Sequence, residues 1–274
     1  MLQPLAEALT STLPATRERV HLMGVEIDRV SFDDVLERVQ SFVAADTPRR
    51  IVTVNLDYLR LARQDESFRH TLNAADLAIA DGMPLVWASR WAGTPLPQRI
   101  AGQDLFDSLC RVGGEHGWSV FLLGAAPGVA ATAGDVMVQR YPGLRIAGAY
   151  SPPVGQFDAV EEGRIRDMIR VARPHVLFVA LGAPRQDLWI RDSLVHVGVP
   201  VAVGVGCSFD VVAGNVARAP RWMQRTGLEW AFRLMQEPRR LWKRYILGDL
   251  PAFLHLMLAA RRNKRTPERV VETT

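Results

Sequence analysis

The sequence has little of what marks secreted, zinc-binding or membrane-spanning proteins. Only two of its 274 residues are cysteines, Cys110 and Cys207, and they form no Cys-x-x-Cys motif. Their scarcity argues against a disulfide framework or a zinc site and fits a reducing compartment. No apolar run reaches about 18 residues, so no membrane-spanning helix is expected. Residues 1–20 lack a basic start followed by an apolar block, so no signal peptide is expected either.

Several catalytic motifs are also missing. The six histidines show neither His-x-His nor HExxH spacing, and no Asp-x-Asp pair is present to hold a metal against a nucleotide diphosphate. The sequence contains no GxGxxG, GxxxxGK[ST] or GxSxG motif, which disfavours a dinucleotide-dependent oxidoreductase, a P-loop protein and a hydrolase with a nucleophile elbow. We therefore expect no bound metal and no cofactor.

What the chain does contain is an alternation of short apolar runs with helical patterns. The runs are 49–55, 76–81, 118–124, 145–150, 175–182 and 199–206. The helical patterns are 57–72, 83–91, 103–116, 128–141, 158–172 and 185–197, preceded by one short strand and a helix capped by Ser31. Strands that are apolar on both faces and alternate with helices predict a Rossmann-like, doubly wound, mostly parallel sheet. We assign residues 1–215 to this catalytic domain.

The remaining segment, 216–274, differs in composition and is predicted to be a basic helical appendage, with helices broken near Pro238 and Pro251. Between residues 218 and 265 twelve Lys/Arg stand against three Asp/Glu, although the whole chain has a formal net charge of only +4. Residues 238–248 form a helical wheel with a basic arc opposite an apolar arc. Such a helix either lies on a membrane surface with anionic lipid or packs on the body with its basic face in water. Nucleic acid is the weaker alternative, because no nucleic-acid motif accompanies the charge.

Ligands of open parallel sheets bind beyond the carboxyl ends of the strands, so the residues that follow each run are the functional candidates. In the stretch DLAIADGMPLVW, Asp81 ends an apolar run and is followed by Gly82. The Asp-Gly pair is either an ordinary turn or a catalytic acid or base held at the edge of the sheet.

Other strand ends leave two interpretations open as well. Gly124 begins a glycine-containing loop that either forms a plain turn or holds a diphosphate on backbone N–H groups. Gln186 begins a helix and is either solvated or directed at phosphate or sugar hydroxyls. Asp104 is equally plausible as an N-cap or as a first-turn acid of a helix. Asp210 either caps a helix or binds a ligand, and Cys207 is interpreted as a packing residue.

Six segments in order carry a resemblance to a known family. They are TVN at 53–55, ADLAIADGMPLVWASR at 75–90, RIAGQDL at 99–105, FLLGAAPGVA at 121–130, LGAPRQDLWI at 181–190 and the long block from 203 to 245. Together they resemble the WecG/TagA/CpsF family of bacterial glycosyltransferases, glycosyltransferase family 26, over roughly residues 22–245.

The resemblance implies an inverting, metal-independent transferase that acts at the cytoplasmic face of the membrane. Its implied partners are a UDP-sugar donor, a polyprenyl-diphosphate-linked sugar acceptor and the inner membrane surface, with no nucleic acid; homo-oligomer formation is left open. Donors of the family include UDP-N-acetylmannosamine, its uronic acid and UDP-glucose. The implied localisation is cytoplasmic and peripheral on the inner face of the cell membrane.

The resemblance also assigns roles to residues. Asp81 is implied to be the catalytic base, and Thr53 and Gln186 match motif positions of the family. The diphosphate is expected to meet appendage arginines. The full set of expected substrate-binding residues is Thr53, Asn55, Gly82, Asp104, Gly124, Gln186, Asp210, Arg218, Arg221, Arg233, Arg239, Arg240 and Arg244.

Two departures from the family pattern lie near the expected sugar pocket and bear on the choice of donor sugar. Asp57 stands where the family often has Glu, and Ala101 replaces a threonine. Two rival functions stay open: a non-catalytic protein that binds membrane surfaces through the basic end, and a nucleotide-cofactor oxidoreductase on a similar sheet.

Overall fold

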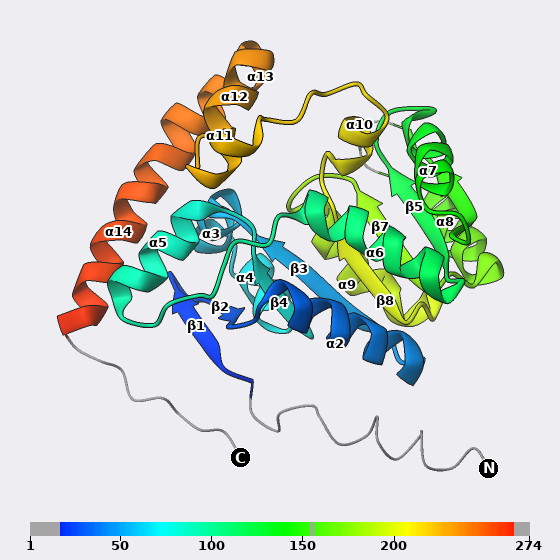
Figure 1. Ribbon diagram of the computed structural model, residues 1–274, viewed down its shortest axis with the longest axis horizontal. Coiled ribbons are helices and arrows are strands. Elements are labelled where there is room, and N and C mark those ends of the chain that lie inside the picture. The colour runs from blue at the N-terminus through cyan, green and yellow to red at the C-terminus, as the bar shows by residue number, and fades with distance from the viewer. Residues whose placement is uncertain (1–16, 154, 156, 266–274) are drawn as a thin grey trace.

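The centre of the molecule is a sheet of six parallel strands in the order β4-β3-β8-β7-β5-β6 (Figure 1). The structure, a computed structural model, describes residues 17–153, 155 and 157–265. The strands are β3 (Arg49–Val54), β4 (Leu77–Ala80), β5 (Ser119–Gly124), β6 (Arg145–Tyr150), β7 (Val176–Ala180) and β8 (Val201–Gly204). Each lies within one of the six predicted runs, and the Rossmann-like α/β fold is confirmed.

Helices cover both faces of this sheet because successive strand residues point to opposite sides. On β3, Ile51 packs with residues of α2, α6 and α7, whereas Val52 packs with α3, α4 and α5 on the other face. Helices α8 and α9 complete that second face. The bounds are α2 (Phe32–Ala45), α3 (Leu56–Gln64), α4 (Glu66–Asn73), α5 (Met83–Ala92), α6 (Gly102–His116), α7 (Val129–Arg140), α8 (Ala159–Ala172), α9 (Arg185–Val197) and α10 (Ser208–Val212).

The N-terminal part differs from the expected single strand. It is an antiparallel hairpin of β1 (Arg19–Leu22) and β2 (Val25–Asp28). The turn places Met23 at a φ of 53° and Gly24 at 84°. Positive φ at both central residues is typical of a tight hairpin, but Met is a rare residue there and gave no turn signal.

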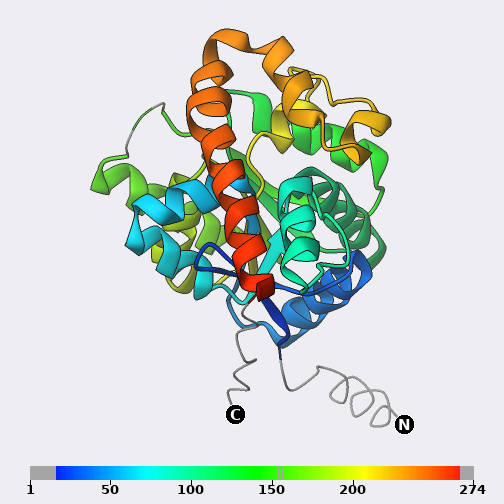
Figure 2. The same ribbon diagram turned by 90° about the vertical axis from the view of Figure 1, so that its left-hand side faces the viewer.

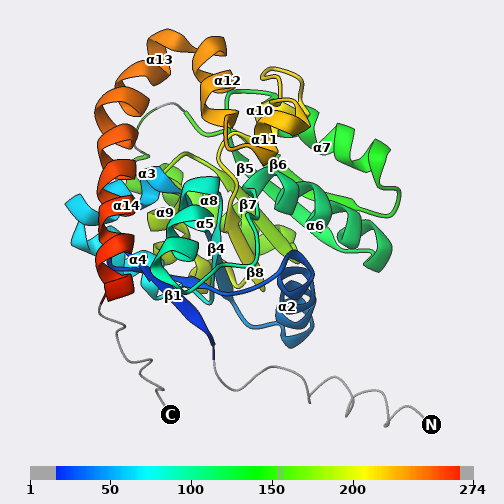
Figure 3. The ribbon, with the colours of Figure 1, turned by 60° about the vertical axis from the view of Figure 1, so that its left-hand side comes forward.

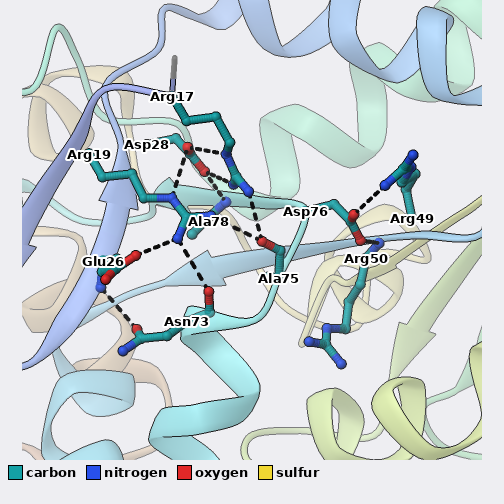
Figure 4. A network of polar contacts seen from close by, with 10 residues as sticks. All are labelled: Arg17, Arg19, Glu26, Asp28, Arg49, Arg50, Asn73, Ala75, Asp76 and Ala78. Atoms are coloured by element: carbon teal, nitrogen blue, oxygen red, sulfur yellow. Dashed lines mark hydrogen bonds and ion pairs between the residues drawn. The ribbon is translucent and has the colours of Figure 1, made fainter. Parts of the chain in front are cut away.

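A buried carboxylate, Asp28, links the hairpin to the edge strand of the sheet (Figure 4). Asp28 accepts hydrogen bonds from Arg17 Nε at 2.9 Å and from the backbone N–H of Ala78, in β4, at 2.7 Å. Arg19 Nε lies 3.5 Å from Asp28 Oδ1, the oxygen that also accepts from Arg17. Two guanidinium groups and one backbone donor compensate for burying this charge.

A second difference concerns residues 57–72, where one helix was expected and two are present. Helix α3 ends at Gln64, and Asp65 has an extended backbone with a φ of −127°. The Asp65 carboxylate accepts a hydrogen bond from the N–H of Phe68 at 3.0 Å and so caps α4. An Asp that can cap competes with helix continuation, which explains the break.

The C-terminal segment is helical, as predicted, and lies along one side of the body (Figures 2 and 3). Its elements are α11 (Arg221–Arg225), α12 (Glu229–Gln236), α13 (Pro238–Trp242), the π-helix η1 (Lys243–Asp249) and α14 (Leu250–Arg265). Helix α14 packs against α5 and α3, where Leu256 and Ala260 are buried. The assignment of 1–215 and 216–274 as separate domains stays a prediction, and residues 1–16 and 266–274 lie outside the described residues.

The break predicted near Pro238 is present, since α12 ends at Gln236 and α13 begins at Pro238. The break predicted near Pro251 is wrong, because the chain runs helically from η1 into α14. Proline lacks an N–H and crowds the preceding turn, which normally interrupts an α-helix. Here the wider π-turns, with Leu250 N–H bonded to Tyr245 O, directly precede Pro251 and accommodate it.

Candidate active site

A cavity of about 550 Å³ lies beyond the carboxyl ends of β3, β4, β7 and β8, below the C-terminal helices. This is the position where ligands of open parallel sheets bind. Its wall brings together the following residues expected from the sequence: Thr53, Asn55, Asp81, Gln186, Asp210, Arg218, Arg233 and Arg244.

Asp81 follows β4 and lies half-buried in the cavity wall. Its backbone N–H donates to Val54 O at 2.7 Å, which continues the sheet pairing by one residue. Burial raises the pKa of the carboxyl group to about 6; the charge of Arg99 opposes this rise and the charge of Glu229 adds to it. A carboxyl group with a pKa close to neutrality in a cleft suits general acid–base chemistry.

Asp81 and Thr53 both lie beside Gly102, the first residue of α6. A Cβ atom on Gly102 would lie 3.6 Å from both Asp81 Oδ2 and Thr53 Cγ2. The buried Thr53 hydroxyl donates to the carbonyl oxygen of Gly204 at 3.2 Å, which ties β3 to β8 at the floor of the cavity. Thr53 on β3 and Asp81 just after the neighbouring strand β4 therefore face the same cavity.

Three arginines of the C-terminal segment reach the cavity, each held by a partner on the body. Arg218 forms an ion pair with Asp104, and Arg233 Nη2 lies 2.8 Å from Cys207 Sγ. Arg244 Nη2 lies 3.1 Å from Asp57 Oδ2. These contacts place three positive charges around one cleft, an arrangement that suits a polyanionic ligand such as a diphosphate.

Several expected site residues do not line the cavity. Gly82 precedes α5 at its N-cap, and Asp104 lies at the edge, paired with Arg218. Gly124 has a φ of 114°, and a Cβ atom there would lie 2.5 Å from Ala180 O, so close strand contact alone accounts for this glycine. Arg221 and Arg239 are exposed, and the side chain of Arg240 lies outside the described residues. Their roles in binding stay predictions.

The structure adds cavity residues that the sequence did not single out. Glu229 of α12 accepts a hydrogen bond from Arg99 Nη1 at 2.7 Å, which links the C-terminal segment to the loop before α6. Tyr58, on α3, also lines the cavity. Cys207 lies in the same wall, although the sequence alone indicated a packing residue. Arg99 is the first residue of the motif RIAGQDL, and its membership of that motif was the sequence signal that could have identified it.

No group of three or more His, Cys, Asp and Glu side chains able to hold a metal ion occurs among the described residues. A second, more open hollow lies along β6 and α8, but it contains none of the expected site residues. The cavity at the strand ends is therefore the candidate active site.

Comparisons with known proteins identify the family to which this chain belongs. The sequence model of the Glycosyl transferase WecG/TagA/CpsF family matches residues 20–267. An N-acetylglucosaminyldiphosphoundecaprenol N-acetyl-beta-D-mannosaminyltransferase of Bacillus spizizenii is 36% identical over 79% of this chain and 81% of its own length. Proteins of the same name from Bacillus subtilis strain 168 and Staphylococcus aureus strain MW2 are 34% and 29% identical over 91% and 89% of this chain, covering 94% of each relative.

These relatives are enzymes, so neither the non-catalytic alternative nor an oxidoreductase is supported. The matched region, residues 20–267, includes both the strand-end cavity and the C-terminal helices that supply its arginines. We conclude that the chain belongs to the Glycosyl transferase WecG/TagA/CpsF family and is a glycosyltransferase.

Proposed function

We propose that this protein is an inverting, metal-independent transferase that moves a hexose-type sugar from a UDP-sugar to a polyprenyl-diphosphate-linked sugar in cell-surface polysaccharide biosynthesis. The observation that carries the proposal is a carboxyl group of raised pKa, Asp81, in a cleft that also collects three arginines. The cleft offers a base for a hydroxyl group and positive charge for diphosphates.

In the proposed reaction, Asp81 takes the proton of the acceptor hydroxyl as its oxygen attacks the anomeric carbon of the donor. The new carbon–oxygen bond forms while the bond from that carbon to the UDP oxygen breaks, so UDP leaves with the bonding electron pair. One displacement inverts the configuration at the anomeric carbon. Arg218, Arg233 and Arg244 stabilise the negative charge that develops on the leaving diphosphate.

UDP-N-acetylmannosamine is the first donor to test, because the named relatives transfer N-acetylmannosamine to N-acetylglucosaminyl-diphosphoundecaprenol. Its uronic acid and UDP-glucose follow, since Asp57 and Ala101 differ from the usual family residues. Asp57 is also engaged by Arg244, which lines the cavity, so this position is placed to affect the choice of substrate.

The proposal is tested by UDP release from a panel of UDP-sugars, with a short-chain polyprenyl-diphosphate-linked sugar as acceptor and EDTA present. We expect one donor to be turned over without added metal, and Asp81→Asn to lose two or more orders of magnitude, in keeping with the roughly 10²–10⁴-fold contribution of a general base. Asp167→Asn, which changes an exposed carboxylate on α8, is the matched control. Near-normal activity of Asp81→Asn would refute the role of Asp81, and metal-dependent turnover would refute metal independence.

We further propose that the C-terminal helices dock on an anionic membrane surface at the inner face of the cell membrane. None of the helices in the described part of the chain combines the length and apolarity needed to cross a bilayer. Helix α14 and the end of η1 nevertheless expose a stripe of leucines, Leu247, Leu250, Leu254 and Leu258, each at least half exposed.

Basic side chains flank this stripe, with Arg239 and Lys243 exposed before it and Arg262 exposed after it. The apolar arc predicted for residues 238–248 is divided in the structure: Leu241 and Tyr245 are buried against the body, whereas Trp242 and Ile246 are 44% and 45% exposed. The proposed lipid-facing surface therefore consists of Trp242 and Ile246 together with the leucine stripe that continues along α14. Leucines inserted at the headgroup boundary and cations near anionic lipid both favour such docking.

Sedimentation with vesicles of anionic and of neutral lipid tests this surface. Replacing Leu254 and Leu258 with Gln removes two apolar side chains worth about 1.5–3 kcal/mol each when buried, so we expect at least tenfold weaker vesicle binding. Val195→Gln, which alters an exposed apolar residue on α9, is the matched control. Unchanged binding of the Leu254/Leu258 variant would refute the docking surface, and equal binding to neutral vesicles would refute the role of charge.

A further inference from the structure

Three buried polar side chains form a chain of hydrogen bonds behind the cavity wall. The Tyr58 hydroxyl of α3 donates to Asp187 Oδ2 at 2.7 Å, and Gln186 Nε2 donates to the Tyr58 oxygen at 2.8 Å. The backbone N–H of Gly206 donates to Gln186 Oε1 at 3.3 Å. All three side chains are at least 97% buried, and Gln186 and Tyr58 both line the cavity.

The direction of these hydrogen bonds fixes the orientation of the Gln186 amide. In its ionised form Asp187 can only accept, so the hydroxyl proton of Tyr58 then points to Asp187 and the Tyr58 oxygen accepts from an N–H. The backbone N–H of Gly206 can only donate, so it requires the carbonyl oxygen of Gln186. The contact with Gly206 therefore imposes this orientation of the amide whether or not Asp187 is ionised, and ionised Asp187 imposes the same one. Within the described part of the chain, Tyr58 is the hydrogen-bond partner of Gln186 Nε2, and the amide also lowers the pKa of the adjacent Asp187. Because Gln186 lines the cavity, an oxygen of a bound ligand can compete for the other hydrogen of this amide.

This arrangement is costly for the fold. Burial raises the pKa of Asp187 to about 7, although the hydrogen bond from Tyr58 opposes the rise. Among the described residues Asp187 Oδ1 has no hydrogen-bond partner. Replacing a buried charge with apolar packing is often neutral or stabilising, so stability alone does not explain an acid here.

The neighbouring strand makes room for the amide. A Cβ atom on Gly204, the last residue of β8, would lie 2.3 Å from Gln186 Nε2. Even alanine at this position would therefore displace the side-chain amide. Both the strand and the hydrogen-bond chain hold one particular placement of Gln186.

We propose that Asp187 and Tyr58 are positioning residues that fix the Gln186 amide as a hydrogen-bond donor to an oxygen of the nucleotide-sugar donor. The inference rests on the proposed function, which places a UDP-sugar in this cavity. Gln186 contacts the ligand, whereas Tyr58 and Asp187 act through Gln186.

A double-mutant cycle separates positioning from a merely structural role. The variants are Tyr58→Phe, Gln186→Ala and both together, each measured for UDP-sugar binding by calorimetry, for KM and kcat, and for thermal stability. If Tyr58 acts through Gln186, each single variant weakens binding about tenfold and the double variant is no weaker than Gln186→Ala, because a shared interaction can be lost only once. Asp187→Asn is expected to weaken donor binding without lowering thermal stability.

Tyr141→Phe is the matched control, since Tyr141 donates to Asp107 at the same 2.7 Å but outside the cavity. We expect donor binding of this variant to equal that of the wild type. Multiplicative effects in the double variant, or wild-type binding by Tyr58→Phe, would overturn the positioning role.

The sugar and nucleotide sources of the oxygen are distinguished by repeating the cycle with UDP alone. Coupling that persists with UDP places the oxygen on the nucleotide, and coupling seen only with the UDP-sugar places it on the sugar. Binding without UDP release by the wild type would refute the proposed transfer while the cycle still decides the positioning role. Absence of any UDP-sugar binding by the wild type would overturn both.

Discussion

Asp81→Asn should make the protein more stable while it removes activity. The fold holds this carboxyl group with a pKa raised from 3.8 to about 6, mainly through burial. That rise corresponds to at most about 3 kcal/mol against the ionised form. Because Asp81 is only half-buried and solvent in the cavity screens its charge, we expect a gain of about 1–2 kcal/mol for the neutral asparagine at pH 7.5.

The pH dependence of this gain follows from proton binding. Between pH 3.8 and about 6 the folded protein holds the Asp81 proton more tightly than the unfolded chain does. The stabilising contribution of protonated Asp81 is therefore complete below pH 3.8 and is lost as the pH rises through about 6. The stability difference between Asp81→Asn and the wild type should grow from pH 5 to pH 7 and then become constant.

Urea unfolding followed by tryptophan fluorescence measures this difference at pH 5.0, 6.0 and 7.5. UDP release at the same pH values gives the activity, and wild-type kcat/KM should be half-maximal near pH 6 and level off above about 7 as the base ionises. Asp167→Asn, on the exposed face of α8, should change neither quantity. An Asp81→Asn variant that is less stable at pH 7.5, or that keeps its activity, would refute the argument and make Asp104 or Asp210 the next candidate base.

Three further predictions concern other parts of the molecule. Asp28→Ala should destabilise the protein by about 1.5–3 kcal/mol in urea unfolding, because Arg17 and the buried Ala78 N–H lose their shared acceptor while Arg19 keeps Glu26. A loss below about 0.5 kcal/mol would contradict the anchoring role of Asp28. Gly204→Ala should raise KM for the UDP-sugar at least tenfold, since its Cβ atom would displace Gln186 Nε2 from a distance of 2.3 Å, and unchanged kinetics in a folded variant would contradict this. Glu229→Gln should shift the acidic limb of the kcat/KM profile to lower pH, because the charge of Glu229 raises the pKa of Asp81; a limb that stays in place or moves to higher pH would count against that electrostatic link.

The sequence by itself determined the sheet and the position of Asp81. The six apolar runs between helical patterns correspond to the six parallel strands. A strand that is apolar on both faces is stable only in a sheet with helices on both sides, which is the parallel arrangement. Asp81 directly follows such a run, so its place at the carboxyl edge followed from local pattern alone. The excess of cations after residue 218 likewise identified the part of the chain that supplies Arg218, Arg233 and Arg244 to the cavity.

Only the tertiary structure decided which partners these groups meet. The pairs Arg218–Asp104 and Tyr58–Asp187 join residues 114 and 129 positions apart, and no local periodicity encodes such contacts. The π-turns before Pro251 could not be predicted for a similar reason. They form where η1 packs against α3, and they let the helix continue through a proline that local rules treat as a helix break. Local pattern sets the elements and their faces, but the pKa of Asp81 and the orientation of Gln186 depend on burial and charge contributed from distant parts of the chain.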